Sequence, residues 1–213
     1  MKHSHTHNSL TINLEDVQLP GNLTMPKQDK GIVIFAHGSG SSRLSPRNNY
    51  VASVLHEIGL GTLLFDLLTE EEDQVYERRF DIELLTKRLL EVTAWLAKYL
   101  KTPFSLGYFG ASTGSAAALQ AAAASDKIKA VVSRGGRPDL AGPSLSNITC
   151  PVLLIVGGED HEVIKLNQMA YKQLTAPKKL EIIPGATHLF EEPGTLEQAA
   201  KVTRDWFDKY LNQ

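Results

Sequence analysis

Short runs of almost entirely apolar residues recur along the chain, at residues 31–36, 61–65, 104–109, 128–132 and 151–156, with a weaker run at 180–183. Runs without polar alternation are typical of strands that are buried on both faces of a parallel sheet. Between them lie segments with apolar residues at helical spacing, most clearly over residues 80–99. This alternation predicts an α/β fold, with a doubly wound, mostly parallel sheet and helices on both of its faces.

The two ends of the chain carry different patterns. From Leu10 to Met25 apolar and polar residues alternate, punctuated by Pro20-Gly21-Asn22, which predicts a half-buried antiparallel hairpin at the edge of the sheet. The last helix opens at Thr195 with a capping-box pattern, Thr195-Leu196-Glu197-Gln198. About 18 residues separate the run ending at Val132 from the next strand, so we expect no lid domain.

Composition narrows the class of protein. The 213 residues are 42% hydrophobic and 22% charged, with a formal net charge of -2 and a single cysteine. These values are typical of a soluble globular domain and exclude a disulfide framework or a thiolate metal cluster. We expect residues 1–8, with three histidines, to form a disordered polar leader rather than a metal-chelating segment, and residues 9–213 to form a single domain.

Partners and location follow from the same features. The absence of a Lys/Arg run argues against nucleic-acid binding, and the absence of a long apolar stretch argues against a signal peptide or a membrane span. We therefore expect a cytoplasmic protein with a small-molecule substrate. An exposed edge hairpin is compatible with either a monomer or a homodimer.

The sequence Gly110-Ala111-Ser112-Thr113-Gly114 follows the third of these apolar runs and precedes an alanine-rich stretch. This is G-x-S-x-G in a strand-turn-helix context, the pattern of a nucleophile elbow. The turn is so tight that a side chain at either glycine would collide with its neighbours. The pattern predicts that Ser112 is a nucleophile.

A serine hydroxyl needs a base to remove its proton and a carboxylate to orient that base. His188 follows the last strand run, and Asp160 follows the run that ends at Gly158. The order Ser112, Asp160, His188 is that of the α/β-hydrolase triad. Four residues are weaker alternatives for the base or the acid: His56, His161, Glu159 and Glu162.

The oxyanion formed by serine attack requires two N–H donors. The backbone amide of Thr113 is the first, and we place the second at the amide of Ser39, in the loop His37-Gly38-Ser39-Gly40 after the first parallel strand. We expect His37 to brace this loop by hydrogen bonds. The loop lacks the Lys-Ser/Thr of a P-loop and the third glycine of a dinucleotide fingerprint. We expect neither a metal nor an organic cofactor.

Four arginines lie in loops at the carboxyl edge of the predicted sheet: Arg43, Arg47, Arg134 and Arg137. A guanidinium fork suits a carboxylate or a phosphate, so these residues suggest an anionic substrate. The acidic segment Glu70–Asp73 lies at the same edge and could instead pair with them to hold the loops together. Both interpretations remain open.

Together these motifs resemble the dienelactone hydrolase family of α/β-hydrolases over nearly the whole chain. The resemblance rests on five segments: Gly21-Asn22-Leu23, His37-Gly38-Ser39-Gly40, Gly110-Ala111-Ser112-Thr113-Gly114, Gly157-Gly158-Glu159-Asp160 and His188. Dienelactone hydrolases proper use a cysteine nucleophile where this chain has Ser112, so the resemblance implies a general serine esterase. Cys150 lies too far from the elbow to replace Ser112, and we interpret it as an inert thiol.

The sequence thus predicts a serine hydrolase that cleaves an ester, thioester or lactone through an acyl-enzyme. The same triad would serve an acyltransferase or a small peptidase, which differ only in the acceptor and the pocket. The alternative outside enzymes is a catalytically silent α/β-hydrolase fold that serves as a binding module.

Overall fold

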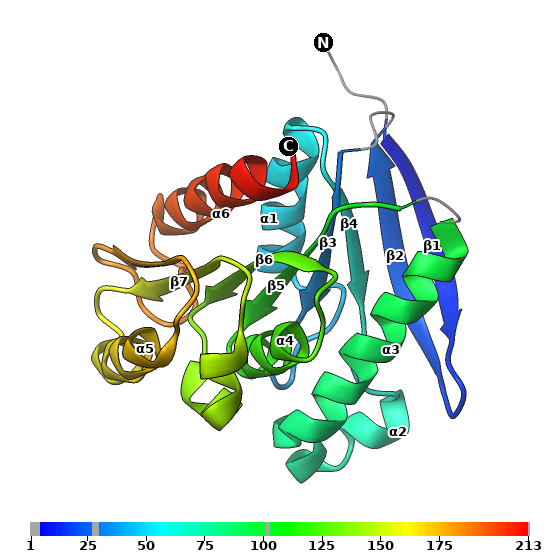
Figure 1. The fold of residues 1–213 in the computed structure, drawn as a ribbon, viewed down its shortest axis with the longest axis horizontal. Helices are drawn as coiled ribbons and strands as arrows, with labels where there is room; N and C mark the ends of the chain where they lie inside the picture. Colours follow the sequence, from blue (N-terminus) through cyan, green and yellow to red (C-terminus); the bar gives the residue numbers. More distant parts are fainter. Residues whose placement is uncertain (1–4, 27–29, 101–102, 213) are drawn as a thin grey trace.

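A computed structural model of the chain describes residues 5–26, 30–100 and 103–212. The eight strands of this part form one sheet in the order β1-β2-β4-β3-β5-β6-β7-β8 (Figure 1). β2 runs antiparallel to both β1 and β4, and all other neighbours are parallel. The strands are β1 (His5–Asn13), β2 (Gln18–Pro26), β3 (Ile32–Ala36), β4 (Gly61–Phe65), β5 (Leu106–Ala111), β6 (Ile128–Arg134), β7 (Val152–Gly157) and β8 (Lys178–Ile183).

Helices cover both faces of this sheet, as the alternating pattern predicts. α1 (Pro46–Glu57) and α6 (Thr195–Leu211) lie on one face, and α3 (Ile82–Leu100), α4 (Thr113–Ala123) and α5 (His161–Gln173) lie on the other (Figure 1). The connecting segments contain α2 (Glu70–Asp73) and two 3₁₀ helices, η1 (Tyr76–Phe80) and η2 (Pro138–Asn147). No described helix is both long and apolar enough to cross a bilayer.

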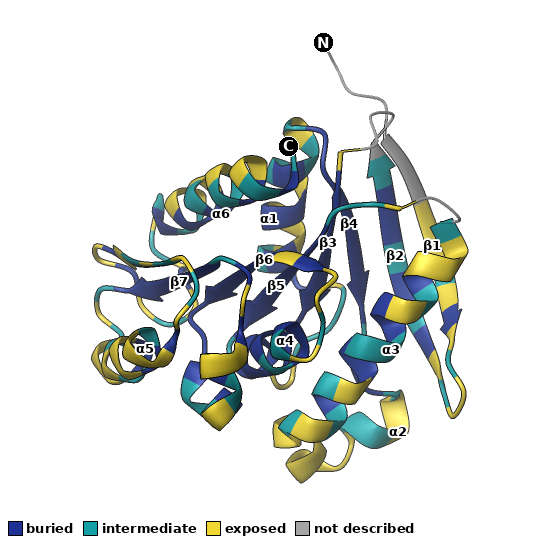
Figure 2. Ribbon diagram, viewed as in Figure 1, coloured by how far each residue is buried: buried dark blue, intermediate teal, exposed yellow. Residues whose placement is uncertain are grey.

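Burial explains why the apolar runs become central strands. Every residue of β3, β4, β5 and β7 is buried, because helices cover these strands on both sides (Figure 2). The buried apolar side chains form two clusters, one on each face of the sheet. β6 and β7 are joined by residues 135–151, which hold η2 and no inserted domain.

Three local predictions were wrong. The hairpin turns at residues 14–17, and Pro20-Gly21-Asn22 lies within β2, where an added Cβ at Gly21 would lie 3.0 Å from the Ile12 side chain. β1 begins at His5, so the predicted leader boundary at residue 8 falls inside a strand; the side chains of residues 1–7 lie outside the described part. Thr195 forms no capping box, since the residue that precedes α6 is Gly194 in the left-handed region at φ 83°.

Candidate active site

The nucleophile elbow forms where β5 meets α4. Ser112 has φ 50° and ψ −122°, a region that L-residues seldom adopt and that often marks a functional site. A Cβ at Gly110 would lie 2.4 Å from the Cα of Ser115. A Cβ at Gly114 would lie 2.3 Å from the carbonyl oxygen of Ala36. Both distances are far too short for any side chain, so the close approach of β5, α4 and β3 requires glycine on each side of Ser112.

Asp160 and His188 form a hydrogen-bonded pair across two loops. The carboxylate Oδ2 of Asp160, just after β7, accepts a bond of 2.7 Å from Nδ1 of His188. A Cβ at Gly157 would lie 2.4 Å from the carbonyl oxygen of Ala186, so the glycine lets the histidine loop pass directly over the end of β7. With its proton on Nδ1, the imidazole leaves Nε2 unprotonated, as a general base requires.

Ser112 and His188 face the same cavity, which has a volume of about 210 Å³. The cavity opens at the carboxyl ends of β5 and β6, the usual ligand position in an open α/β sheet. The structure therefore places Asp160 in contact with His188, and places His188 and Ser112 on the lining of one cavity. His161 begins α5 and does not line this cavity, and His56 bonds Thr62 instead.

The two predicted oxyanion donors are neighbours. Thr113 is the first residue of α4, so its amide has no acceptor within the helix. The Ser39 amide already donates a 2.9 Å hydrogen bond to Oγ1 of Thr113. The sequence did not predict this side-chain contact.

His37 holds the base of the same loop, as predicted. Its Nδ1 lies 2.9 Å from the carbonyl oxygen of Gly38, and its Nε2 accepts a 3.0 Å bond from the amide of Leu67. Burial lowers the pKa of His37, which keeps the ring neutral and able to make both bonds. His37 therefore ties the end of β3 to the segment after β4.

Two of the four loop arginines pair with carboxylates outside the cavity of Ser112. Arg43 pairs with Asp66 through its backbone amide, at 2.6 Å, and through its guanidinium. Arg137 forms a two-pronged pair with Asp139, at 2.8 and 2.9 Å. These contacts hold the loops, and neither arginine lines the cavity of Ser112.

In the part of the chain that the structure describes, the loop arginines do not pair with Glu70–Asp73, which was one of the two interpretations left open by the sequence. Glu72 caps α2 together with Thr69, and its carboxylate contacts Arg88 at 3.0 Å and Arg78 at 3.3 Å. Asp73 pairs with Arg79 at 2.8 Å. The charges of Glu72 and Asp73 are therefore paired with arginines of η1 and α3, within residues 69–88.

Arg134 is the most unusual charged group in the cavity. It is 7% exposed, although it lines the same cavity as Ser112 and His188. Its Nη2 donates to Oδ1 of Asn48 at 3.3 Å, whereas its buried Nη1 has no protein partner. Burial, followed by the like charge of Arg47, lowers the pKa of Arg134 to about 10. No carboxylate in the described part of the chain forms an ion pair with it.

Aromatic rings and an amide hold this guanidinium in place. It lies over the rings of Phe109 and Phe190, 5.7 and 5.8 Å from their centroids. Phe190 has φ 56°, and among the described non-glycine residues only Ser112 shares a positive φ. The roles of Asn48 and Phe190 could not be found from the sequence, because an asparagine inside a helix and a lone phenylalanine in a loop carry no motif.

Arg47 also lines the cavity and reaches its rim. Its guanidinium contacts the exposed carboxylate of Glu191 at 3.1 Å. An exposed pair of this kind contributes little to stability and can open without a large cost. The cavity thus carries two guanidinium groups, one of them without a counter-ion.

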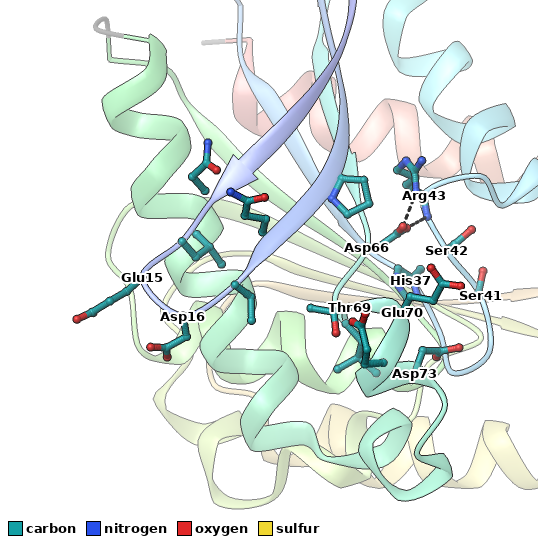
Figure 3. A pocket seen from close by; sticks show the side chains of 17 residues that line it. Glu15, Asp16, His37, Ser41, Ser42, Arg43, Asp66, Thr69, Glu70 and Asp73 are labelled. Atoms are coloured by element: carbon teal, nitrogen blue, oxygen red, sulfur yellow. Dashed lines mark hydrogen bonds and ion pairs between the residues drawn. The ribbon is translucent and has the colours of Figure 1, made fainter.

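A larger pocket of about 1050 Å³ lies on the other side of the loop that follows β3 (Figure 3). Four acidic residues line it, Glu15 and Asp16 from the β1–β2 turn at one end and Glu70 and Asp73 of α2 at the other (Figure 3). Ser112 and His188 do not line it. Within the described residues, no group of three or more His, Cys, Asp or Glu side chains could hold a metal ion. The predicted nucleophile and base line the smaller cavity instead.

Comparison with known families covers all of the chain except its two ends. The profile described as "Dienelactone hydrolase family" matches residues 19–211. The chain belongs to the dienelactone hydrolase family. A crystal structure of a dienelactone hydrolase from Anabaena variabilis is 52% identical, with a TM-score of 0.94, and the match covers 98% of this chain and 100% of that one. Est1E from Butyrivibrio proteoclasticus shares the fold, with a TM-score of 0.81 at 21% identity, over 94% of this chain and 98% of Est1E.

Curated relatives of this family member are longer proteins. Two, from strains of Mycobacterium tuberculosis, are 58% identical over 197 residues and are named "Putative phosphoribosyl transferase". The match covers 92% of this chain and 44% of each relative. The chain therefore spans less than half the length of the curated relatives it matches.

Proposed function

We propose that this chain is a serine hydrolase that cleaves an ester, thioester or lactone of a small, anionic substrate through an acyl-enzyme intermediate. The observation that carries the proposal is the position of Ser112. It stands at a strained elbow on the wall of a cavity that also holds His188, whose Nδ1 is bonded to Asp160 at 2.7 Å.

The proposed reaction follows from these positions. Nε2 of His188 takes the hydroxyl proton of Ser112 as Oγ attacks the substrate carbonyl, and Asp160 stabilises the imidazolium. The amides of Thr113 and Ser39 donate to the oxyanion, assisted by the N-terminus of α4. His188 then gives its proton to the leaving group. Water, activated by the same imidazole, attacks the acyl ester and releases the acid.

The cavity supports a small substrate that carries negative charge. Its volume of about 210 Å³ admits a short acyl group. Arg134 has a buried, unpartnered Nη1, and a buried cation without a counter-ion is costly unless a ligand supplies one. Of the four arginines considered from the sequence, Arg134 and Arg47 are the ones that line this cavity. We therefore assign anion recognition to these two and loop stabilisation to Arg43 and Arg137.

Other activities use the same residues differently. An acyltransferase or a small peptidase would share the triad and differ in the acceptor. The name of the mycobacterial relatives points to phosphoribosyl transfer, but the hydrolase profile accounts for residues 19–211 of this chain. We propose that this name refers to the part of those proteins that this chain does not match.

The direct test combines covalent labelling with turnover. Wild-type protein and Ser112→Ala are treated with a fluorophosphonate and examined by intact mass, and both are assayed with p-nitrophenyl esters from acetate to octanoate. We expect a single adduct and ester hydrolysis in the wild type, with both lost in the variant. The best substrate should be a short ester, because the cavity is small.

A matched serine variant controls for general effects of the substitution. Ser53→Ala changes an exposed serine on α1, outside the cavity, and should keep both the adduct and the activity. Folded wild-type protein with neither an adduct nor turnover would refute the hydrolase proposal and favour a silent binding module. Turnover that rises strongly with an added alcohol or amine would identify an acyltransferase.

A further inference from the structure

One hydrogen bond joins the loop after β3 to the elbow itself. The amide of Ser39 donates to Oγ1 of Thr113 at 2.9 Å. Ser39 is exposed, whereas Thr113 is only 4% exposed and is fixed as the first residue of α4. The rigid partner of this bond is therefore the threonine, and the partner that needs to be held is the loop.

The peptide that carries this donor is also held at its carbonyl end, where Nδ1 of His37 lies 2.9 Å from the carbonyl oxygen of Gly38. Gly38 packs against the nucleophile, since an added Cβ there would lie 3.0 Å from the Cβ of Ser112. Gly40 adopts φ 67°, and the amide of Ser41 turns back to the carbonyl oxygen of Gly38 at 3.1 Å. Two glycines flank Ser39 and allow the backbone more freedom than other residues would, so the contact with Thr113 adds a restraint at the N–H end of the peptide.

The position of Thr113 gives this bond its significance. In the proposed reaction the backbone amide of Thr113 is the first oxyanion donor and the amide of Ser39 is the second. The Thr113 hydroxyl therefore sets the second donor at a defined place relative to the first. Oxyanion donors must be in place before the reaction, because reorienting them during it would consume the stabilisation that they provide.

We infer that the side chain of Thr113 is a positioning residue for the oxyanion hole, with its hydroxyl orienting the Ser39 amide. The inference rests on the proposed hydrolase function. A neutral hydroxyl is a weaker acceptor than an oxyanion, so the Ser39 N–H is shared with the substrate oxygen as negative charge develops there. An interaction that strengthens only in the transition state raises kcat and leaves KM almost unchanged.

The test removes the hydroxyl while keeping the shape of the side chain. Thr113→Val should lower kcat by about 10- to 100-fold, below the full loss of one oxyanion donor. KM should change by less than about twofold, because the substrate's ground state does not use this contact. Thr113→Ser, which keeps the hydroxyl, should restore most of the activity. Thr113→Ala replaces the valine variant if valine misfolds.

A second readout separates positioning from simple stability. A trifluoromethyl ketone that adds to the nucleophile carries an oxyanion, so its inhibition constant should rise in Thr113→Val by the same factor by which kcat/KM falls. Thr203→Val removes another buried threonine hydroxyl, bonded to Ala199 within α6, and should leave both values unchanged. A fall in melting temperature alone would not produce this pattern.

The outcomes distinguish this inference from the proposed function. If wild-type turnover depends on Ser112 but kcat is unchanged or raised in Thr113→Val, the role of the Thr113 hydroxyl is refuted and the proposed function stands. A raised kcat would mean that the hydroxyl competes with the substrate for the Ser39 amide. If the wild type shows no turnover, or turnover that survives in Ser112→Ala, both the proposed function and this inference are refuted.

Discussion

Replacing Arg134 by methionine should make the protein more stable and less active toward charged esters. Methionine keeps a long apolar side chain between Phe109 and Phe190 but removes the buried guanidinium. If Arg134 serves the fold, the substitution should destabilise it. If Arg134 serves a ligand, the substitution should raise the free energy of unfolding, because the buried charge is removed, and should weaken binding of the anion.

The expected gain in stability can be worked from the burial of this side chain. Burial lowers the pKa of Arg134 from 12.5 to about 10, which at about 1.4 kcal/mol per pH unit is a cost of about 3 kcal/mol for the cation. The bond to Asn48 and the two ring contacts offset about 2 kcal/mol of this. The variant should therefore be more stable by about 1 kcal/mol, equivalent to a rise in Tm of about 3 °C.

The kinetic assay compares two esters of the same length and different charge. Mono-p-nitrophenyl glutarate carries a carboxylate where p-nitrophenyl valerate carries a methyl group. Loss of the buried partner of an anion costs about 3 kcal/mol, so kcat/KM for the glutarate should fall about 100-fold in Arg134→Met. The valerate should be hydrolysed by the variant at nearly the wild-type rate, because its acyl chain carries no charge.

Arg137→Met is the matched control. Its guanidinium is already paired with Asp139 at 2.8 Å, and it lies outside the cavity. We expect it to leave the ratio of glutarate to valerate hydrolysis unchanged. A lower Tm in Arg134→Met, with an unchanged ratio, would refute this reasoning and would make Arg134 a structural residue.

Three further predictions concern the triad, the elbow and the cysteine. Asp160→Asn should lower kcat about 10⁴-fold with KM retained, because the amide favours the wrong tautomer of His188; a loss below tenfold in steady-state assays would exclude Asp160 as the orienting acid. Gly114→Ala should destabilise the fold by about 3 kcal/mol in chemical denaturation, since its Cβ would lie 2.3 Å from the carbonyl oxygen of Ala36; an unchanged midpoint would contradict the tight elbow. Burial raises the pKa of Cys150 to about 11, so iodoacetamide at pH 8 should label the unfolded but not the folded protein, and rapid labelling of the folded form would show that the thiol is accessible.

Local sequence patterns predicted the secondary structure correctly where the burial of a single strand accounts for the pattern. The unbroken apolar runs identified β3, β4 and β7 as buried strands, because only a strand covered on both faces can bury every side chain. The pattern failed for Pro20-Gly21, which resembles a turn and lies within β2. There the pairing of β2 with β1 and β4 overrides the local turn preference.

The candidate site could be predicted in outline because the triad depends on residue types and chain order. Ser112 is marked by its glycines, and Asp160 and His188 follow buried strands, whose carboxyl ends meet at one edge. The bond of Ser39 to the Thr113 side chain could not be predicted, because it joins residues 74 positions apart whose loops carry no signal for each other.

The sequence by itself determined the fold class, with its doubly wound, mostly parallel sheet, and the residues that could form a triad. Only the tertiary structure decided what each arginine does. Arg43 lies in the loop after β3 and Arg134 is the last residue of β6, yet one meets Asp66 and the other is buried without a counter-ion. The physical reason is that ion pairing and desolvation act over a few ångströms. The groups that come this close to an arginine are far from it in the chain, so only the folded structure determines them.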